Sequence, residues 1–316
     1  MQTLLLTHPA FLRHETGPLH PERPARMRAI DAALAEPAFA ALRREEAPWR
    51  DDAEAAILLA HSHAYLEHVR AIVADRDRLP VRIGPDTVVA EGTWEAALRA
   101  VGAGLYAIDT VMDSASGVTN AFCQVRPPGH HAERDRAMGF CLFSTAAIAG
   151  LYARARHGAW RIAVIDFDVH HGNGAQRIFW SDTDMFYGST HQMPLFPGTG
   201  AISERGVGNI CNAPLRAGDG GAAFRAAFEE RILPALESFG PDLILVSAGF
   251  DAHRNDPLAD LRLLELDFAW VTDQIVSAAH RHCGGRIVSF LEGGYQLDAL
   301  ARSTAVHVEA LMRGTG

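Results

Sequence analysis

Short apolar segments alternate along the chain with longer, alanine-rich stretches that carry apolar residues at helical spacing. The apolar segments predict β-strands at Gln2–Leu6, Ala121–Val125, Ile162–Phe167, Met185–Tyr187, Leu243–Ser247 and Ile287–Leu291. The alanine-rich stretches predict helices at Pro24–Ala35, His63–Ala74, Trp94–Val111, Ser144–Ala155, Ala222–Phe239 and Phe268–His282. Several of these strands are apolar almost throughout, as expected when both faces are buried. The alternation therefore predicts an α/β fold, with a parallel sheet covered by helices on both faces.

Several element boundaries carry their own signals. Ser62 precedes the helix that begins at His63 and can cap it, and Gly284 with Gly285 can end the last predicted helix. Gly240-Pro241 separates another helix from the strand at Leu243. No linker or repeat divides the chain, so we expect residues 1–316 to form a single domain.

Composition limits the classes of protein to consider. Apolar residues make up 48% and charged residues 21% of the 316 residues, which provides a large core and excludes a disordered chain. The net charge of −9 argues against direct nucleic-acid binding. The four cysteines are scattered without a Cys-x-x-Cys pair, which fits a reducing compartment. We expect a cytoplasmic protein, because we find neither a signal peptide nor an apolar run that could span a bilayer.

Polar side chains gather where four of the predicted strands end. These strands lead into Arg126-Pro-Pro-Gly-His-His, Asp166-Phe-Asp-Val-His-His-Gly-Asn-Gly, Asp251-Ala-His and Glu292-Gly-Gly-Tyr. In parallel α/β sheets, ligands bind beside the carboxyl ends of the strands. The sequence therefore predicts the functional site at this edge of the sheet.

The second of these segments has the pattern of a metal site. On extended chain Asp166, Asp168 and His170 share one face, where two carboxylates would repel each other without a cation. Carboxylates with an imidazole suit zinc, and Asp251 at a neighbouring strand end is the expected third ligand. The alternative is that these are solvated polar residues at the start of a loop.

The paired histidines indicate acid–base chemistry. Two prolines and a glycine precede His130 and His131, and such a rigid turn would aim both imidazoles. Asp166 and Asn173 are expected to orient them, and Tyr295, after two glycines, could donate a hydrogen bond to an oxyanion. A surface histidine pair and a buried packing tyrosine are the alternatives.

Six motifs in order resemble the zinc-dependent histone deacetylase family over residues 20–295. They are Arg126-Pro-Pro-Gly-His-His, Gly139-Phe-Cys-Leu-Phe, Asp166-Phe-Asp-Val-His-His-Gly-Asn-Gly, Phe196-Pro-Gly-Thr-Gly, Ala248-Gly-Phe-Asp-Ala and Glu292-Gly-Gly-Tyr. Asn173 and the last motif resemble the class II branch, which includes bacterial histone deacetylase-like amidohydrolases and acetylpolyamine amidohydrolases. The family commonly has asparagine after Gly139-Phe-Cys-Leu-Phe, whereas Ser144 and Thr145 follow here, which could change the packing behind the tunnel wall.

The resemblance implies the arginase/deacetylase fold, three layers around a central eight-stranded parallel sheet, with one zinc ion and a structural potassium ion. It implies roles for individual residues, as follows: Asp168, His170 and Asp251 as zinc ligands; His131 as general base and acid, with His130 more electrostatic; Asp166 and Asn173 as their partners; Tyr295 as the carbonyl-polarising residue; Phe140 and Phe196 as walls and Gly139 as floor of an acyl-lysine tunnel; Leu258 and Asp86 at its rim; Arg26 in an internal channel; and Asp166, Asp168, His170 and Ser189 around potassium.

The expected activity is therefore removal of acetyl or other acyl groups from an amine, most simply acetyl-lysine in a protein or peptide. A metal-activated water would attack the amide, with His131 as base and Tyr295 as oxyanion donor. Three alternatives stay open: an acetylpolyamine or other small-amine deacetylase, an arginase-type manganese ureohydrolase, and a non-catalytic acyl-binding module. A narrow polyamine site needs a carboxylate at the rim, and the sequence has Leu258 there, which favours acyl-lysine over a polyamine. The chain could also form a homo-oligomer.

Overall fold

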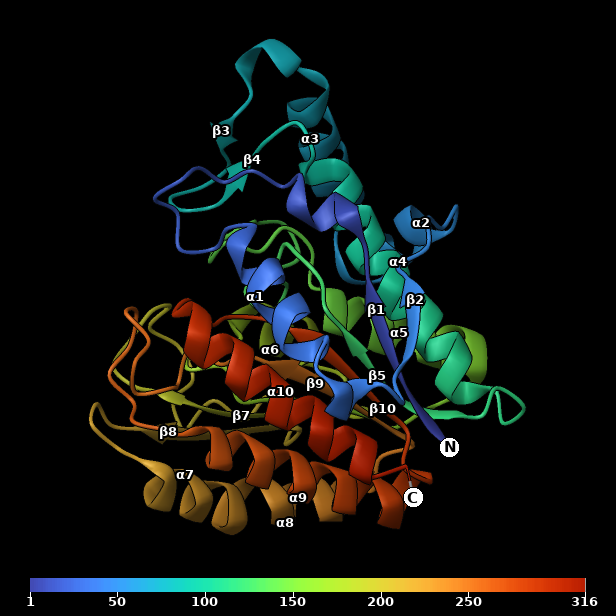
Figure 1. The fold of residues 1–316 in the computed structure, drawn as a ribbon, viewed down its shortest axis with the longest axis vertical. Coiled ribbons are helices and arrows are strands. Elements are labelled where there is room, and N and C mark those ends of the chain that lie inside the picture. Colours follow the sequence, from blue (N-terminus) through green and yellow to red (C-terminus); the bar gives the residue numbers. More distant parts are fainter. Residues whose placement is uncertain (316) are drawn as a thin grey trace.

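The computed structural model describes residues 1–315, which form one eight-stranded parallel sheet with helices on both faces (Figure 1). The strand order is β2-β1-β5-β10-β9-β6-β7-β8, with every neighbouring pair parallel. The strands are β1 Gln2–Thr7, β2 Arg43–Glu46, β5 Val118–Cys123, β6 Ile162–Asp166, β7 Met185–Gln192, β8 Ile210–Leu215, β9 Leu243–Ala248 and β10 Ile287–Leu291. A separate antiparallel hairpin is formed by β3 Val81–Arg82 and β4 Val88–Val89. The predicted fold class is confirmed.

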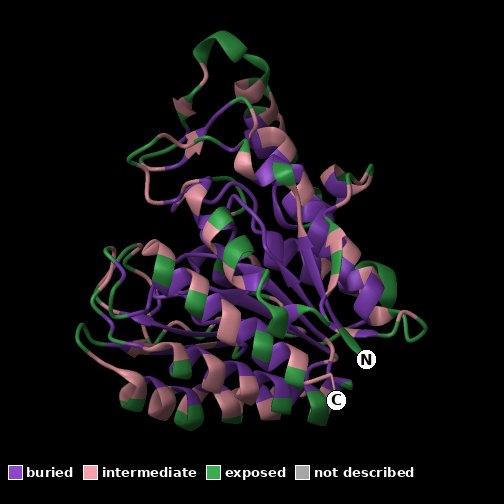
Figure 2. Ribbon diagram, viewed as in Figure 1, coloured by how far each residue is buried: buried purple, intermediate pink, exposed green. Residues whose placement is uncertain are grey.

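Helices cover the sheet from both sides. They are α1 Ala25–Leu34, α2 Ala53–Ala60, α3 His63–Ala74, α4 Thr93–Met112, α5 Thr145–His157, α6 Asn173–Phe179, α7 Gly221–Ala227, α8 Leu233–Phe239, α9 Glu265–Cys283 and α10 Leu297–Arg313. Adjacent residues of β10 show the two faces, because side chains alternate along a strand. Ser289 points to His307 on α10, with Oγ 2.8 Å from Nε2, whereas Phe290 packs near Gly104 on α4. Figure 2 shows the strands buried between helices whose outer faces are exposed.

The structure contains elements that the apolar pattern did not predict. The edge strand β2 has the sequence Arg-Arg-Glu-Glu, so no apolar run marks it. The other edge strand, β8, includes Pro214, which lacks an N–H donor and is tolerated at an edge. Helix α10 was also missed. The predicted helix over residues 222–239 is divided by a π-helical turn, Phe228–Ile232, just before Pro234.

Predicted boundary signals act as expected. Ser62 Oγ accepts the backbone N–H of Tyr65 at 3.2 Å, which caps α3. Gly240 and Gly284 follow α8 and α9 with φ angles of +63° and +61°, values that suit glycine. No helix within residues 1–315 has both the length and the apolar character needed to cross a bilayer.

Candidate metal centre and active site

The carboxyl ends of the central strands bring the predicted site residues together. Strand β6 lies between β9 and β7, and its last residue, Asp166, is in register with Ser247 on β9 and Ser189 on β7. Strand β10 lies beside β9, so the segment after Leu291 leaves the sheet next to the segment after Ala248. The polar motifs that are distant in sequence therefore meet at one edge of the sheet.

Three predicted metal ligands form a buried cluster there. Asp168, His170 and Asp251 each offer a donor atom, and these atoms lie within 4.8 Å of one another. His170 Nδ1 is 3.2 Å from Asp168 Oδ1 and 3.1 Å from Asp251 Oδ2. One imidazole nitrogen thus faces two carboxylates, which is the arrangement expected around a shared cation.

The surrounding backbone fixes both carboxylates. Gly293 N–H donates to Asp168 Oδ2 at 2.8 Å, and Val169 N–H donates to Asp251 Oδ1 at 2.9 Å. A Cβ atom on Gly249 would lie 2.0 Å from Asp168 Oδ2, and one on Gly293 would lie 2.1 Å from Asp251 Oδ2. Both glycines are therefore needed for the carboxylates to reach their positions.

The donor set fits a single zinc ion better than a pair of manganese ions. Two carboxylates and one imidazole are a three-ligand set that leaves further coordination positions for water and substrate. An arginase-like pair of metals would need more donors, and His253 is the nearest candidate in sequence. Its Nδ1 instead accepts the N–H of Asn255 at 3.1 Å, and its Nε2 lies 3.6 Å from Glu265 Oε1.

The histidine pair lies beside the metal cluster, with ring centroids 4.0 Å apart. His130 Nδ1 is 3.0 Å from Asp166 Oδ2, and His131 Nδ1 is 2.9 Å from Asn173 Oδ1. Both partners are those predicted from the sequence. Both histidines are buried, so the surface-pair alternative is wrong.

The orientation of the Asn173 amide determines which nitrogen of His131 carries a proton. Asn173 Nδ2 donates to Glu133 Oε1 at 2.7 Å, which leaves Asn173 Oδ1 to face His131. An oxygen acceptor requires His131 Nδ1 to be the donor, so its Nε2 carries a lone pair. Glu133 thereby helps to set the tautomer, a role that the sequence did not indicate.

The two histidines have opposite electrostatic environments. Burial, followed by the charges on His130 and His170, lowers the pKa of His131 well below its usual value. Burial also lowers the pKa of His130, but the carboxylates of Asp168, Asp166 and Glu292 outweigh it and raise that pKa well above its usual value. The pKa values of the two neighbouring imidazoles are therefore shifted in opposite directions.

Glu292 holds the turn that carries both histidines. Its Oε2 accepts the N–H groups of Gly129 and His130 at 2.7 and 3.1 Å, and its Oε1 accepts Ser247 Oγ–H at 3.1 Å. Burial raises the pKa of this carboxyl to about 7. The motif Glu292-Gly-Gly-Tyr was found in the sequence, but its pattern did not reveal a contact across 163 residues.

Tyr295 lies among aromatic and charged groups. Its ring centroid is 5.9 Å from that of Phe140, and the Arg26 guanidinium carbon is 5.2 Å from it. Burial, followed by the Asp251 carboxylate, raises the pKa of Tyr295 well above its usual value. The phenol is therefore a hydrogen-bond donor across the physiological pH range.

Arg26 belongs to a fully buried ionic cluster behind this tyrosine. Its Nε donates to Gly294 O at 2.7 Å, and its Nη1 donates to Glu22 Oε1 at 3.0 Å. Arg126 also binds Glu22, with Nη2 2.7 Å from Oε2. The cluster connects the loop before α1 to the histidine and tyrosine loops.

The proposed tunnel residues border the catalytic groups. The ring centroid of Phe196 lies 5.1 Å from that of His131, and its side chain is 40% exposed. Gly139 and Phe140 both have left-handed φ angles, +57° and +66°. A Cβ atom on Gly139 would be 2.2 Å from Cδ2 of His131, so this glycine packs directly against that imidazole.

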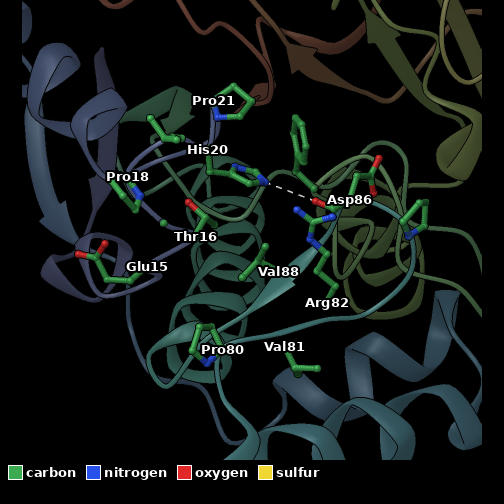
Figure 3. A pocket seen from close by; sticks show the side chains of 14 residues that line it. Glu15, Thr16, Pro18, His20, Pro21, Pro80, Val81, Arg82, Asp86 and Val88 are labelled. Carbon is green, nitrogen blue, oxygen red and sulfur yellow. Dashed lines mark hydrogen bonds between the residues drawn. The ribbon is translucent and has the colours of Figure 1, made fainter.

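Asp86 lies at the rim, beside a groove of about 810 Å³ between the 15–21 loop and the β3–β4 hairpin (Figure 3). Its Oδ1 accepts the N–H of Gly139 at 3.0 Å, and its backbone oxygen is 3.4 Å from His20 Nε2. Phe140 lines the same groove. The Asp86 carboxylate therefore holds the backbone of Gly139, the proposed tunnel floor, from the edge of this groove.

Leu258 is half-buried, and its backbone N–H donates to Asp256 Oδ1 at 3.0 Å. Behind the tunnel wall, Ser144 N–H donates to His61 Nε2 at 2.9 Å, and its Oγ has no partner among residues 1–315. Ser189 Oγ is 2.9 Å from His191 Nδ1, so a potassium ion at the predicted set would share this hydroxyl with a histidine.

Comparisons with known proteins agree with this geometry. The family described as "Histone deacetylase domain" matches residues 20–311. The chain is 40% identical to a histone deacetylase-like amidohydrolase of Pseudomonas aeruginosa over 282 residues, which cover 87% of this chain and 72% of the relative. It is also 40% identical to Histone deacetylase 14, chloroplastic, of Arabidopsis thaliana, covering 93% and 73% of the two chains. The crystal structure of the HDA15 HD domain superposes with a TM-score of 0.89 at 34% identity, covering 98% of this chain and 88% of that one.

Proposed function

The chain belongs to the histone deacetylase family of hydrolases, and on that premise we propose that it is a zinc-dependent deacetylase of acylated amines, acting most readily on acetyl-lysine in a peptide or protein. The observation that carries the proposal is the buried cluster of Asp168, His170 and Asp251, with the His131 ring centroid 6.0 Å from that of His170.

Asp168, His170 and Asp251 would hold zinc, which when bound polarises a carbonyl and acidifies a water molecule. The remaining chemistry falls to residues of the chain. His131 Nε2, unprotonated because Nδ1 donates to Asn173, accepts a proton from the attacking water. The same nitrogen then delivers that proton to the departing amine, and the products are a carboxylic acid and a free amine.

Negative charge develops on the oxygen of the former amide carbonyl during the attack. Tyr295 provides a hydrogen bond to it, and His130 provides positive electrostatic potential. The phenol of Tyr295 donates to the oxygen of the former amide carbonyl, a preorganised contact of the kind that contributes most to acyl transfer. The carboxylates around His130 raise its pKa, and a positive charge there stabilises the negative charge that develops; burial, followed by that charge, lowers the pKa of His131. Asp166 holds His130 in that orientation.

We propose that Phe140 and Phe196 enclose the acyl-lysine stem. An apolar passage suits an uncharged alkyl chain and disfavours a second ammonium group, which would lose hydration there. Leu258 at the rim offers no carboxylate to a polyamine, which favours a peptide substrate. A structural potassium ion near Asp166, Asp168, His170 and Ser189 belongs to the same proposal. We also keep the cytoplasmic location as part of it.

Replacement of Tyr295 by phenylalanine tests the oxyanion role. Removal of one such donor costs roughly 10²–10³-fold in kcat. We expect a loss of this size in the hydrolysis of an acetyl-lysine peptide, with zinc content per chain unchanged by elemental analysis. An unchanged rate with zinc bound would refute the role assigned to the phenol.

Two further measurements separate the rival functions. One metal ion per chain in the active protein, lost on chelation and restored by zinc, agrees with a deacetylase, whereas two manganese ions would indicate a ureohydrolase. Parallel turnover of an acetyl-lysine peptide and of acetylputrescine then distinguishes the substrate classes. Faster turnover of acetylputrescine would overturn our assignment of a peptide substrate.

A further inference from the structure

A buried carboxylate outside the predicted site connects the rim loop to the tyrosine loop. Asp256 Oδ2 accepts the backbone N–H of Tyr295 at 2.7 Å and lies 3.4 Å from the backbone nitrogen of Gln296. Its Oδ1 accepts the N–H of Leu258 at 3.0 Å. Only 8% of Asp256 is exposed, so water does not replace these contacts.

Burial of a carboxylate is costly, and two features make the cost larger here. The side chain forms no ion pair with any cationic residue in the described chain, and the Asp251 carboxylate is near. Burial, followed by the charge of Asp251, raises the pKa of Asp256 to about 7. Its interactions are therefore backbone N–H groups alone, donated by two loops that both border the active site.

Two buried side chains hold the backbone that leads into Tyr295. Gly294, which precedes it, has a φ angle of +119°, a conformation that only glycine adopts readily. Helix α10 begins just beyond it, with Gln296 Oε1 accepting the N–H of Ala299 at 2.6 Å. Arg26 Nε donates to the carbonyl of Gly294, and Asp256 accepts the N–H of Tyr295, so the two side chains hold the two polar groups of the peptide unit that leads into the tyrosine.

Resting on the function proposed above, we infer that Asp256 is a positioning residue for the hydrolysis reaction. It fixes the backbone of Tyr295 so that the phenol meets the substrate oxygen, and it holds Leu258 at the rim in the same geometry. The side chain of Asp256 acts through Tyr295 and touches no reacting atom.

This role predicts a specific pattern of coupling between two substitutions. Asp256→Ala frees the Tyr295 N–H, and a misplacement of the phenol by about 1 Å can cost ~10²-fold in rate. We expect kcat for an acetyl-lysine peptide to fall ~10- to 100-fold, with a smaller change in KM. In a Tyr295→Phe background the phenol is already absent, so Asp256→Ala should lower kcat by less than about threefold more.

The experiment compares the parent chain, both single variants and the double variant, each with measured zinc content and melting temperature. Asp256→Asn retains one oxygen acceptor but faces the other N–H with an amide group, so it should show the same coupling with a smaller loss. It replaces the alanine variant if that variant does not fold. Asp260→Asn, on the same loop with an exposed side chain, is the control and should retain full activity.

Three results would be informative. Losses that multiply in the double variant would overturn the inference, because Asp256 would then act independently of Tyr295. Unchanged kcat in both Asp256 variants would overturn it as well. A fully active Tyr295→Phe variant would instead refute the oxyanion role, which is a failure of the proposed function and not of the positioning contact.

Discussion

Gly139→Ala tests whether the tunnel floor positions the catalytic base. The glycine N–H is held by Asp86, and its α-carbon faces the imidazole ring of His131. A methyl group there would lie 2.2 Å from Cδ2 and 2.6 Å from Cγ of that ring, whereas ordinary contacts begin near 3.4 Å. The ring or the tunnel floor must therefore move by about 1 Å.

The expected loss follows from that displacement. The left-handed φ of +57° by itself costs an alanine about 1–2 kcal/mol of folding free energy. The steric conflict adds a displacement of His131, and a shift of about 1 Å at a reacting group can lower the rate ~10²-fold. The three atoms nearest to the new methyl group all belong to His131 and none to a proposed metal ligand, so we expect zinc to stay bound.

The assay measures kcat/KM for an acetyl-lysine peptide, zinc content and the free energy of unfolding. Gly158→Ala is the matched control, because its φ of +65° imposes the same backbone cost while nothing lies within 4 Å of the added Cβ. The control should lose comparable stability and keep its activity. Near-parental activity in Gly139→Ala with zinc bound would refute the reasoning, since the base would then tolerate the displacement.

Three other predictions concern polar groups that are buried or that bind buried partners. Glu22→Ala leaves two buried guanidinium groups without their anion, so it should lower the free energy of unfolding by about 3–5 kcal/mol in urea denaturation. The control Glu91→Ala removes one partner of an exposed ion pair and should change this free energy by less than about 0.5 kcal/mol. Equal effects of the two substitutions would contradict the burial argument. Glu133→Ala releases the Asn173 amide and should lower kcat, whereas Glu133→Gln, which still accepts from Nδ2, should retain most activity; the reverse order in kcat assays would rule out the tautomer argument. Burial lowers the pKa of His307 to about 3, so between pH 6.5 and 3 the unfolded chain binds one more proton than the folded chain, and the free energy of unfolding falls as the pH decreases. From pH 7 to 5 the parent should lose about 2 kcal/mol more of this free energy than His307→Gln. Equal losses would show that this histidine titrates normally in the folded protein.

The sequence by itself determined the fold class, and it named the residues that we propose for the site. Apolar strands alternating with helices required a covered parallel sheet, because strands buried on both faces have no polar side to expose to water. The metal donors Asp168 and His170 follow one strand within a few residues, so their spacing places them together before any tertiary contact is known. The partners of the paired histidines were also predicted correctly, at Asp166 and Asn173.

Only the tertiary structure showed what holds those groups in place. Edge strand β2 has no apolar pattern, and only the structure shows that its backbone pairs in parallel with β1. Glu292, Glu133 and Asp256 contact the catalytic loops from positions 39 to 163 residues away. Such contacts leave no signal in the local sequence, because the two partners come close only in the folded chain. The cost of removing a carboxylate from water is offset by its hydrogen bonds only after folding has brought those partners together.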